Sequence, residues 1–390
     1  MQVKQSIERP FSLSQRLVSR IMELEEEKAK GKKIVGYYPS EYVPEELILA
    51  SGAVPLGLAK GGEYGAVLNS GKYIPRWNDT FCRAQIGYRA MGDFFYSIID
   101  LYVCFSTHFA ARVIVDNYNF FAPELDTYRL EIPHSQNDLG FDYYVKGINK
   151  FKDKMQELTG NEITNSNLTD AIKLCNRERD LLRQLSLLRE PDGIRISGHE
   201  YVSLNHASYV LEKESMITML EQLLESKKAL KPSRQRPRIM LAGSALAMSD
   251  YGIYEMVEEN KAAIVIEYFG EAMRDYWTEV EPAGNLQDSM HNLARRYFYD
   301  KVVNFAFRPS RGYRQFLVKL AKQFRVDGVI WYQPMYQDNG DFECIMFSDL
   351  LKKEMPVPLL KLYTEYDSIE RSALETRVET FIEVVKSKVK

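Results

Sequence analysis

The four cysteines offer the clearest starting point for chemistry in this sequence. They stand at Cys82, Cys104, Cys175 and Cys344, far apart in 390 residues and without a CxxC pair. So few cysteines, in a chain with no predicted secretory signal, argue against a disulfide framework. Cys82 directly precedes a predicted helix over residues 83–95, and a thiol near a helix N-terminus is biased toward thiolate and metal ligation. A buried, inert thiol fits the same position equally well.

The histidines show no spacing typical of a metal site. His199 and His206 are seven residues apart, so a helix could align them, but ordinary surface or polar-core histidines are the commoner case. His108 is better placed, because it follows a predicted strand at residues 101–105. The motifs GxxxxGK[ST], GxGxxG, HExxH and GxSxG do not occur, and the Gly61-Gly62 pair is typical of a turn.

The elements that would position these residues alternate along the chain. Apolar residues at helical spacing predict a helix over residues 12–33, followed by a strand at 34–38. Pro44 with two acids behind it predicts a helix start, and this helix should stop at Gly52 before a strand at 54–58. A strand, a helix and a strand in so short a stretch predict a parallel sheet covered by helices.

The same alternation continues to the end of the chain. Strands are predicted at 101–105 and 128–132. Residues 141–188 and 209–228 are predicted to be helical, and one of these helices is expected to start at Thr169-Asp170. After a basic, proline-containing linker at 231–238, strands are predicted at 239–243, 263–267, 326–331 and 357–363. Helices are expected over 107–121, 251–260, 288–299 and 311–324.

This pattern predicts an α/β protein with two doubly wound, Rossmann- or flavodoxin-like parallel-sheet domains and a helical middle segment. The expected divisions are an N-terminal helix (1–33), a first α/β domain (34–145), the helical segment (146–230) and a second α/β domain (231–390). Ligands of such sheets bind at the carboxyl ends of the strands. The loops around Ser106–His108 and Gln333–Phe342 therefore matter most.

The composition argues against two classes of protein, those that bind nucleic acids and those that span a membrane. The formal net charge is -3, from 51 basic and 54 acidic residues, which does not suggest a nucleic-acid footprint. Apolar stretches are short and interrupted by charges, so no membrane span is expected and a cytoplasmic location is the default.

The order and spacing of several segments resemble the 2-hydroxyacyl-CoA dehydratase D-component family, which includes benzoyl-CoA reductase subunits and double-cubane cluster proteins. The run GYYPSEYVPEELI at 36–48, followed by Ala50-Ser51-Gly52 and Val54-Pro55-Leu56-Gly57, resembles the family's "G…(Y/F)xPEElIxAAGxxPxG" opening. The resemblance spans residues 30–385. Its other matches lie at Asp100-Leu101, 176–179, 238–243, 327–330 and 377–383.

The resemblance implies a 4Fe-4S cluster held by three cysteines in loops of both halves. Those positions fall on Cys82, His108 and Gln337, so one thiolate of three is kept, and glutamine is a poor ligand. Cys82 and His108 could hold a cluster if Cys344 or a partner residue supplied another ligand; the chain otherwise carries no cluster, or a labile one. The additional cysteines of double-cubane proteins fall near Ser244 and Phe269, which disfavours that branch.

The resemblance further implies a subunit of an oxygen-sensitive acyl-CoA enzyme. Its partners would be a homologous cysteine-rich subunit, an ATP-dependent activator and an acyl-CoA substrate, whose thioester receives one electron from the cluster while protein groups supply protons. The candidates for that work are Ser40, Glu46 and His108. Glu46 is more simply interpreted as an acid in the first turn of a helix, where the helix dipole stabilises it. His108 is equally well interpreted as a polar residue that fills the space of the lost cluster. A non-catalytic scaffold subunit is the alternative, and dehydratase versus reductase remains open.

Overall fold

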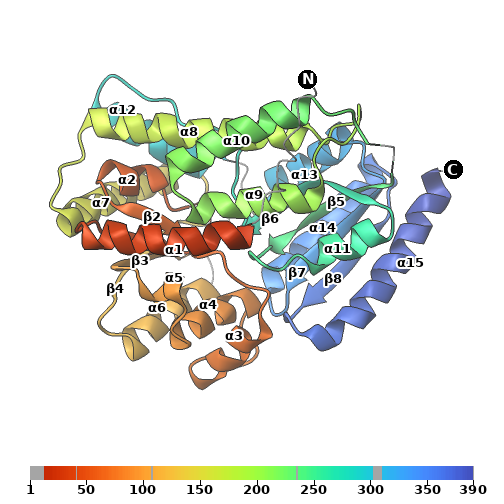
Figure 1. Cartoon of the computed structure of the whole chain (residues 1–390), viewed down its shortest axis with the longest axis horizontal. Coiled ribbons are helices and arrows are strands. Elements are labelled where there is room, and N and C mark those ends of the chain that lie inside the picture. Colours follow the sequence, from red (N-terminus) through yellow and green to blue (C-terminus); the bar gives the residue numbers. More distant parts are fainter. Residues whose placement is uncertain (1–12, 41, 107–108, 234–235, 302–309, 390) are drawn as a thin grey trace, which may run out of the picture.

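The computed structural model describes residues 13–40, 42–106, 109–233, 236–301 and 310–389. Two parallel sheets of four strands each form the frame, with helices packed on both faces (Figure 1). The first sheet contains β1 (Ile34–Tyr37), β2 (Val54–Gly57), β3 (Leu101–Phe105) and β4 (Asp126–Leu130), in the order β2-β1-β3-β4. The second contains β5 (Arg238–Ala245), β6 (Ala263–Glu271), β7 (Gly328–Pro334) and β8 (Leu359–Thr364), in the order β6-β5-β7-β8. The predicted fold class is confirmed.

The central strands form where the sequence is continuously apolar, because strands covered on both faces are buried throughout. β3 is fully buried along its length, and its bounds are those predicted. Gly243 shows how tightly β5 packs against β7. A Cβ at this position would lie 1.8 Å from the carbonyl oxygen of Tyr332, so no larger residue fits.

Helices account for most of the remaining described residues. Around the first sheet lie α1 (Leu13–Ala29), α2 (Glu45–Ala50), α3 (Tyr64–Asn69), α4 (Thr80–Ala90), α5 (Phe94–Ser97) and α6 (Phe109–Phe121). Between β4 and β5 the chain forms α7 (Asp138–Thr159), which crosses the expected division at 145/146, and then α8 (Asn165–Leu187), α9 (Gly198–Val210) and α10 (Lys213–Lys228). The later helices are α11 (Gly252–Glu259), α12 (Leu286–Arg295) with the π-turn η2 (Arg296–Asp300), α13 (Arg311–Gln323), α14 (Asp338–Glu354) and α15 (Arg371–Val389).

Two predicted helix starts are wrong, and side-chain capping explains both. α8 begins after Thr164, whose hydroxyl accepts a hydrogen bond from the backbone N–H of Asn167, and not at Thr169-Asp170. The stretch expected to run from Tyr209 to Lys228 is broken, because α9 ends at Val210 and Glu212 caps α10. A capping side chain satisfies backbone N–H groups that the helix leaves free, and it fixes the first turn.

The carboxyl ends of the two sheets face each other. The backbone N–H of Ala272, just after β6, donates to the carbonyl of Pro39 after β1 (2.7 Å). The N–H of Met248, after β5, donates in the same way to Ala59 after β2 (2.7 Å). Helix α9 contacts both β2 and β6 and so bridges the two sheets. The position where α/β sheets bind ligands therefore lies between the two halves.

A buried network of charges holds this junction. The Arg274 guanidinium donates to both carboxylate oxygens of Glu45 in α2 (2.7 and 2.9 Å). Lys213 of α10 pairs with Glu45 at 2.8 Å and with Glu178 of α8 at 2.5 Å. All four residues are buried, so the network ties helices of the first half and of the middle segment to the loop after β6.

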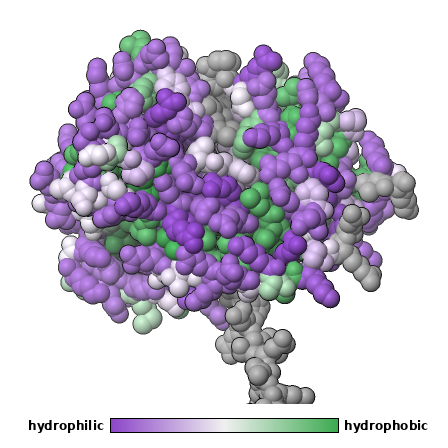
Figure 2. Space-filling view, turned by 90° about the horizontal axis from the view of Figure 1, so that it is seen from above, coloured by the Kyte–Doolittle hydropathy of each residue, from purple (hydrophilic) through white to green (hydrophobic). Residues whose placement is uncertain are grey.

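The outer surface differs from this interior. Seen from above, the molecule is largely hydrophilic, with apolar side chains confined to patches (Figure 2). Within the described residues, no helix is both long and apolar enough to cross a membrane.

Candidate functional site

A cavity of about 250 Å³ opens where the two sheets meet. Its walls come from both halves. The segment before α4 and the first turn of α6, after β3, face the end of β6 and the turn between β7 and α14. We call this space the central cavity; its lining consists of Trp77, Asn78, Asp79, Phe109, Ala110, Glu271, Tyr336, Gln337, Asp338 and Asn339.

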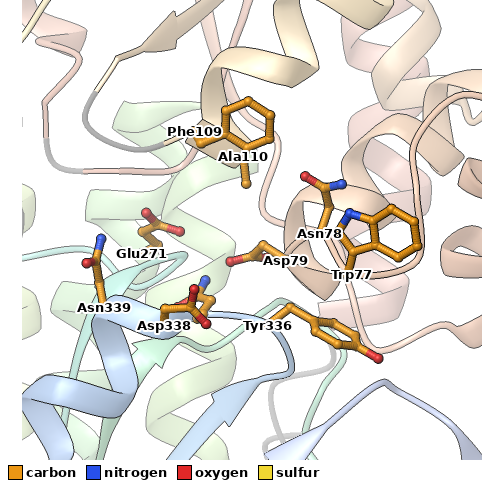
Figure 3. A pocket seen from close by; sticks show the side chains of 10 residues that line it. Trp77, Asn78, Asp79, Phe109, Ala110, Glu271, Tyr336, Asp338 and Asn339 are labelled. Carbon is orange, nitrogen blue, oxygen red and sulfur yellow. The ribbon is translucent and has the colours of Figure 1, made fainter.

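Three carboxylates gather in the central cavity. Asp79, Glu271 and Asp338 lie around the middle of the space, with Phe109 on one side and Tyr336 on the other (Figure 3). Glu271 is buried as the last residue of β6, whereas Asp338 is exposed at the first turn of α14. The described lining contains no lysine or arginine, so the cavity is suited to protons, hydrogen-bond donors or cations and poorly suited to an anion.

A hydrogen-bonded chain runs from the floor of the cavity to Cys82. The Tyr38 hydroxyl donates to Glu271 Oε2 at 2.7 Å and lies 3.4 Å from the Cys82 sulfur. The phenol ring packs edge-on against Phe81 and Phe105, which fixes its orientation. Cys82 is fully buried, does not line the cavity, and contacts both Tyr38 and Asp79.

Cys82 lies in the first turn of α4, where Asp79 caps the helix by accepting a hydrogen bond from the Cys82 backbone N–H (3.0 Å). A helix N-terminus favours a thiolate, but burial raises the pKa of the Cys82 thiol well above its usual value. The negative charges of Asp79 and Glu271 raise this pKa further, and the hydrogen bond with Tyr38 only partly offsets them. In the metal-free chain burial therefore favours the neutral thiol, which agrees with the second of the two interpretations of Cys82 that the sequence left open.

The structure brings some of the other predicted site residues to this place. Gln337 lines the central cavity at the start of α14, close to the segment that leads into Cys82. Ser40 is buried beside Glu271, with which it forms an isolated antiparallel bridge, and its hydroxyl has no hydrogen-bond partner in the described part of the chain. His108 lies outside the described residues, between β3 and α6.

Glu46 is engaged elsewhere. Its carboxylate accepts hydrogen bonds from Arg179 of α8 (2.6 Å) and from the Tyr297 hydroxyl (2.8 Å), and it does not line the central cavity. Burial alone would raise the pKa of Glu46, but the charges of Arg179 and Arg296 outweigh it and lower the pKa. This environment is that of a charged residue which joins α2 to α8 and η2.

The described residues do not fit a cluster bound by three thiolates of this chain. Cys104 lies in β3 and its thiol donates to the carbonyl of Ala111 at 3.2 Å, while Cys344 packs in a separate core beneath the second sheet. Gln337 and the cavity carboxylates are poor substitutes for cysteine sulfur. Among the residues that the structure describes, no group of three or more histidine, cysteine, aspartate or glutamate side chains is arranged to hold a metal ion.

Sequence reasoning missed the acidic and aromatic lining of the cavity. The loop from Gln333 to Phe342 is predictable from its position after a strand, but the role of Asp338 within it is not. Glu271 lies beyond the predicted end of its strand, because β6 continues four residues past Glu267. Only their position in the fold could have pointed to these carboxylates. The ends of elements from the two halves face each other, and these ends carry Asp79, Glu271 and Asp338.

A second cavity, of about 320 Å³, lies at the carboxyl ends of β5, β7 and β8. Asp250 accepts hydrogen bonds from the Tyr332 hydroxyl at both carboxylate oxygens, each at 2.9 Å. Burial raises the pKa of Asp250 to about 7, and the hydrogen bonds of Tyr332 only partly offset this effect.

The Asp250→Asn variant is expected to stabilise the protein more at pH 8 than at pH 5. Because the pKa of Asp250 is raised on folding from 3.8 to about 7, the folded state binds the proton more tightly. The free energy of unfolding therefore falls as the pH rises from 3.8 to about 7. The asparagine amide does not titrate, so the variant does not lose stability in this range. Melting temperatures of both proteins at the two pH values test this, with the exposed Asp349→Asn variant as control. Equal shifts at pH 5 and pH 8 would show that Asp250 titrates normally.

Comparison with known proteins gives a consistent result over nearly the whole chain. The model of the family described as "2-hydroxyglutaryl-CoA dehydratase, D-component" matches residues 41–385. The chain is 21% identical to the (R)-phenyllactyl-CoA dehydratase beta subunit of Clostridium sporogenes, over 91% of this chain and 92% of the relative. It is 23% identical to a benzoyl-CoA reductase subunit of Thauera aromatica, again over 91% and 92%. Identity to the beta subunit of the (R)-2-hydroxyglutaryl-CoA dehydratase of Acidaminococcus fermentans is 24%, over 91% and 93%.

Proposed function

Because the chain belongs to the 2-hydroxyglutaryl-CoA dehydratase D-component family, we propose that it is one subunit of a cytoplasmic, oxygen-sensitive enzyme that processes an acyl-CoA. In this proposal it pairs with a homologous, cysteine-rich sister subunit that carries the 4Fe-4S cluster. An ATP-dependent activator supplies the electron that this cluster passes to the substrate thioester. The names of the relatives, which are two dehydratase beta subunits and one reductase subunit, support a multi-subunit assembly.

The contribution of this chain follows from the central cavity. With about 250 Å³ it is smaller than the pockets that usually enclose a drug-sized ligand, roughly 300–1,000 Å³, so it can admit only part of an acyl-CoA. Glu271 is the buried carboxylate of its floor and is held by Tyr38. A positioned carboxylate can take or give a proton in the reaction, which is work the family chemistry needs beside the electron transfer.

The observation that supports this assignment of the cluster is that the described residues bring only one cysteine, Cys82, close to the central cavity. Of the three family positions only Cys82 is a cysteine, and it is fully buried against Tyr38, while Cys104 and Cys344 pack elsewhere in the described structure. Iron–sulfur clusters are normally held by several cysteine thiolates, and a single cysteine does not supply them. We therefore assign the cluster to the sister subunit and assign no electron-transfer step to residues of this chain.

The alternative is a scaffold subunit without a chemical role. Glu46 favours it, because this candidate catalytic acid is engaged with Arg179 and Tyr297. In that reading the central cavity is the remnant of a cluster site, and the chain only supports its partner.

Iron and sulfide analysis of anaerobically purified protein tests the proposal. The chain should be co-expressed with a cysteine-rich family member from the same organism, and both the single chain and the complex should be analysed. We expect the two chains to co-purify in equal amounts, with iron and sulfide present in the complex and at background in this chain alone. A Cys82→Ser variant should leave the iron content of the complex unchanged.

Two results would contradict the proposal. Iron and sulfide in the isolated chain that disappear in Cys82→Ser would assign a cluster to this chain. Failure of the two chains to associate would remove the paired-subunit assignment altogether.

A further inference from the structure

Large apolar side chains are exposed around the mouth of the central cavity. Trp77 and Phe109 are 74% and 72% exposed, and Tyr336 is partly exposed beside them. All three line the cavity, so they form an apolar rim around an acidic interior. A single exposed apolar residue is ordinary, but a contiguous group marks a surface that another molecule covers.

The apolar rim continues along α14. This helix begins with Asp338 and Asn339 in the cavity wall, and Phe342 stands one turn further on. Phe342, Ile345 and Met346 are exposed by 66%, 58% and 50%. Their spacing of three and four residues places them on one side of the helix. We call the whole surface the α14 face; it consists of Trp77, Phe109, Tyr336, Phe342, Ile345 and Met346.

A basic groove of about 650 Å³ lies beside this face, between α13 and α14, and Met346 belongs to both surfaces. Arg314 and Lys322 pair with Glu343 and Glu354 and are largely neutralised. The remaining cations of the groove are exposed and take part in no ion pair within the described chain: Arg311, Lys319 and Lys353. The lining contains five cationic side chains and two acidic ones, Asp349 and Glu354, so the groove is positive overall.

We propose that the α14 face and its basic groove form the docking surface for the cysteine-rich sister subunit, whose matching surface is apolar with an acidic border. This inference rests on the proposed function. Tryptophan, tyrosine, phenylalanine and methionine are the residues that interfaces favour at their centres. Complementary charge at the edge guides association and selects the partner. The docked subunit would cover the mouth of the central cavity and complete the site.

A second copy of this chain is a poorer occupant of the same surface. A symmetric dimer uses the same patch on both partners. The basic groove of one copy would then lie close to the basic groove of the other, and like charges brought together at an interface weaken it. A partner of opposite charge avoids this cost.

The test measures association of this chain with the cysteine-rich family member of the same organism. We expect Ile345→Asp to raise the dissociation constant about 30-fold or more, the effect of losing a central interface residue. Lys319→Glu should slow association most strongly at low ionic strength. Leu139→Asp, at a residue of α7 that is 79% exposed, is the matched control and should bind like the wild type. Circular dichroism of each variant confirms that the fold is kept.

The outcomes separate this inference from the proposed function. Association of Ile345→Asp with wild-type affinity would show that the α14 face is not the docking surface, while the paired-subunit function would stand. Absence of association for the wild type would refute the proposed function itself. Dimers of this chain alone that are disrupted by Ile345→Asp would assign the surface to a second copy and overturn the choice of partner.

Discussion

Replacement of Arg274 by alanine should lower the free energy of unfolding by about 3–5 kcal/mol, the range found when one partner of a buried ion pair is removed. Arg274 is buried and donates two hydrogen bonds to Glu45. Its guanidinium also donates to Ser208 and lies over the ring of Tyr209, 4.4 Å from the centroid. The variant would leave the Glu45 carboxylate in the interior with Lys213 as its remaining cation.

Urea unfolding followed by circular dichroism measures this effect. The control is Arg371→Ala, because Arg371 is about half exposed and pairs with Glu255 and Glu375 on the surface. Exposed pairs of this kind contribute roughly 0–1 kcal/mol. Similar losses for the two variants would mean that the buried network does not hold the halves together.

The pH dependence of stability should report the same network. Burial by itself raises the pKa of Glu45, but the charges of Arg274 and Lys213 outweigh it and lower the pKa below 4.5. The stabilisation by the charged carboxylate is therefore complete above that value and is lost as the pH falls below it. The free energy of unfolding of the wild type should therefore fall with pH in this acid range. If the Arg274→Ala variant does not show this fall, the effect in the wild type is due to Glu45.

The sheets can be predicted from the sequence because their strands are apolar runs between recognisable breaks. The predicted bounds of β3 are those observed, and its five residues are all buried. The predicted strand at 263–267 is four residues too short, because β6 continues to Glu271. In the structure Glu267 is fully buried and pairs with Arg189 of the middle segment at 2.6 Å. A long-range ion pair of this kind leaves no local pattern in the sequence.

The central cavity can be predicted only in part. The rule that ligands bind at the carboxyl ends of strands points to the loop that contains Gln337, and the family resemblance points to Cys82. That the two sheets face each other is a tertiary arrangement, which brings Glu271 of one half and Asp79 of the other into the same cavity. Neither residue stands in a local motif. The thiol of Cys82 also cannot be judged from position, because its pKa depends on burial and on those two carboxylates.

The largest expected effect on activity is that of Glu271→Gln. We expect this variant to lower kcat of the assembled enzyme by about 10²–10⁴-fold, the usual contribution of a positioned general acid or base. Of the three cavity carboxylates, Asp79 caps α4 and Asp338 is exposed, whereas Glu271 is buried and held by Tyr38. Glutamine has the same shape and can still accept the hydrogen bond of Tyr38, so the fold should be kept while the proton-transfer group is lost.

Steady-state kinetics of the complex, with the acyl-CoA that it turns over, distinguish a chemical role from a positioning role. Loss of a proton-transfer group lowers kcat, leaves KM nearly unchanged and removes one limb of the pH–rate profile. Asp338→Asn, in the same cavity, should have a smaller effect, and Glu271→Gln should bind the sister subunit normally because Glu271 is buried. If Glu271→Gln turns over like the wild type, proton transfer by this cavity is excluded, and the chain acts as the scaffold of its cluster-bearing partner.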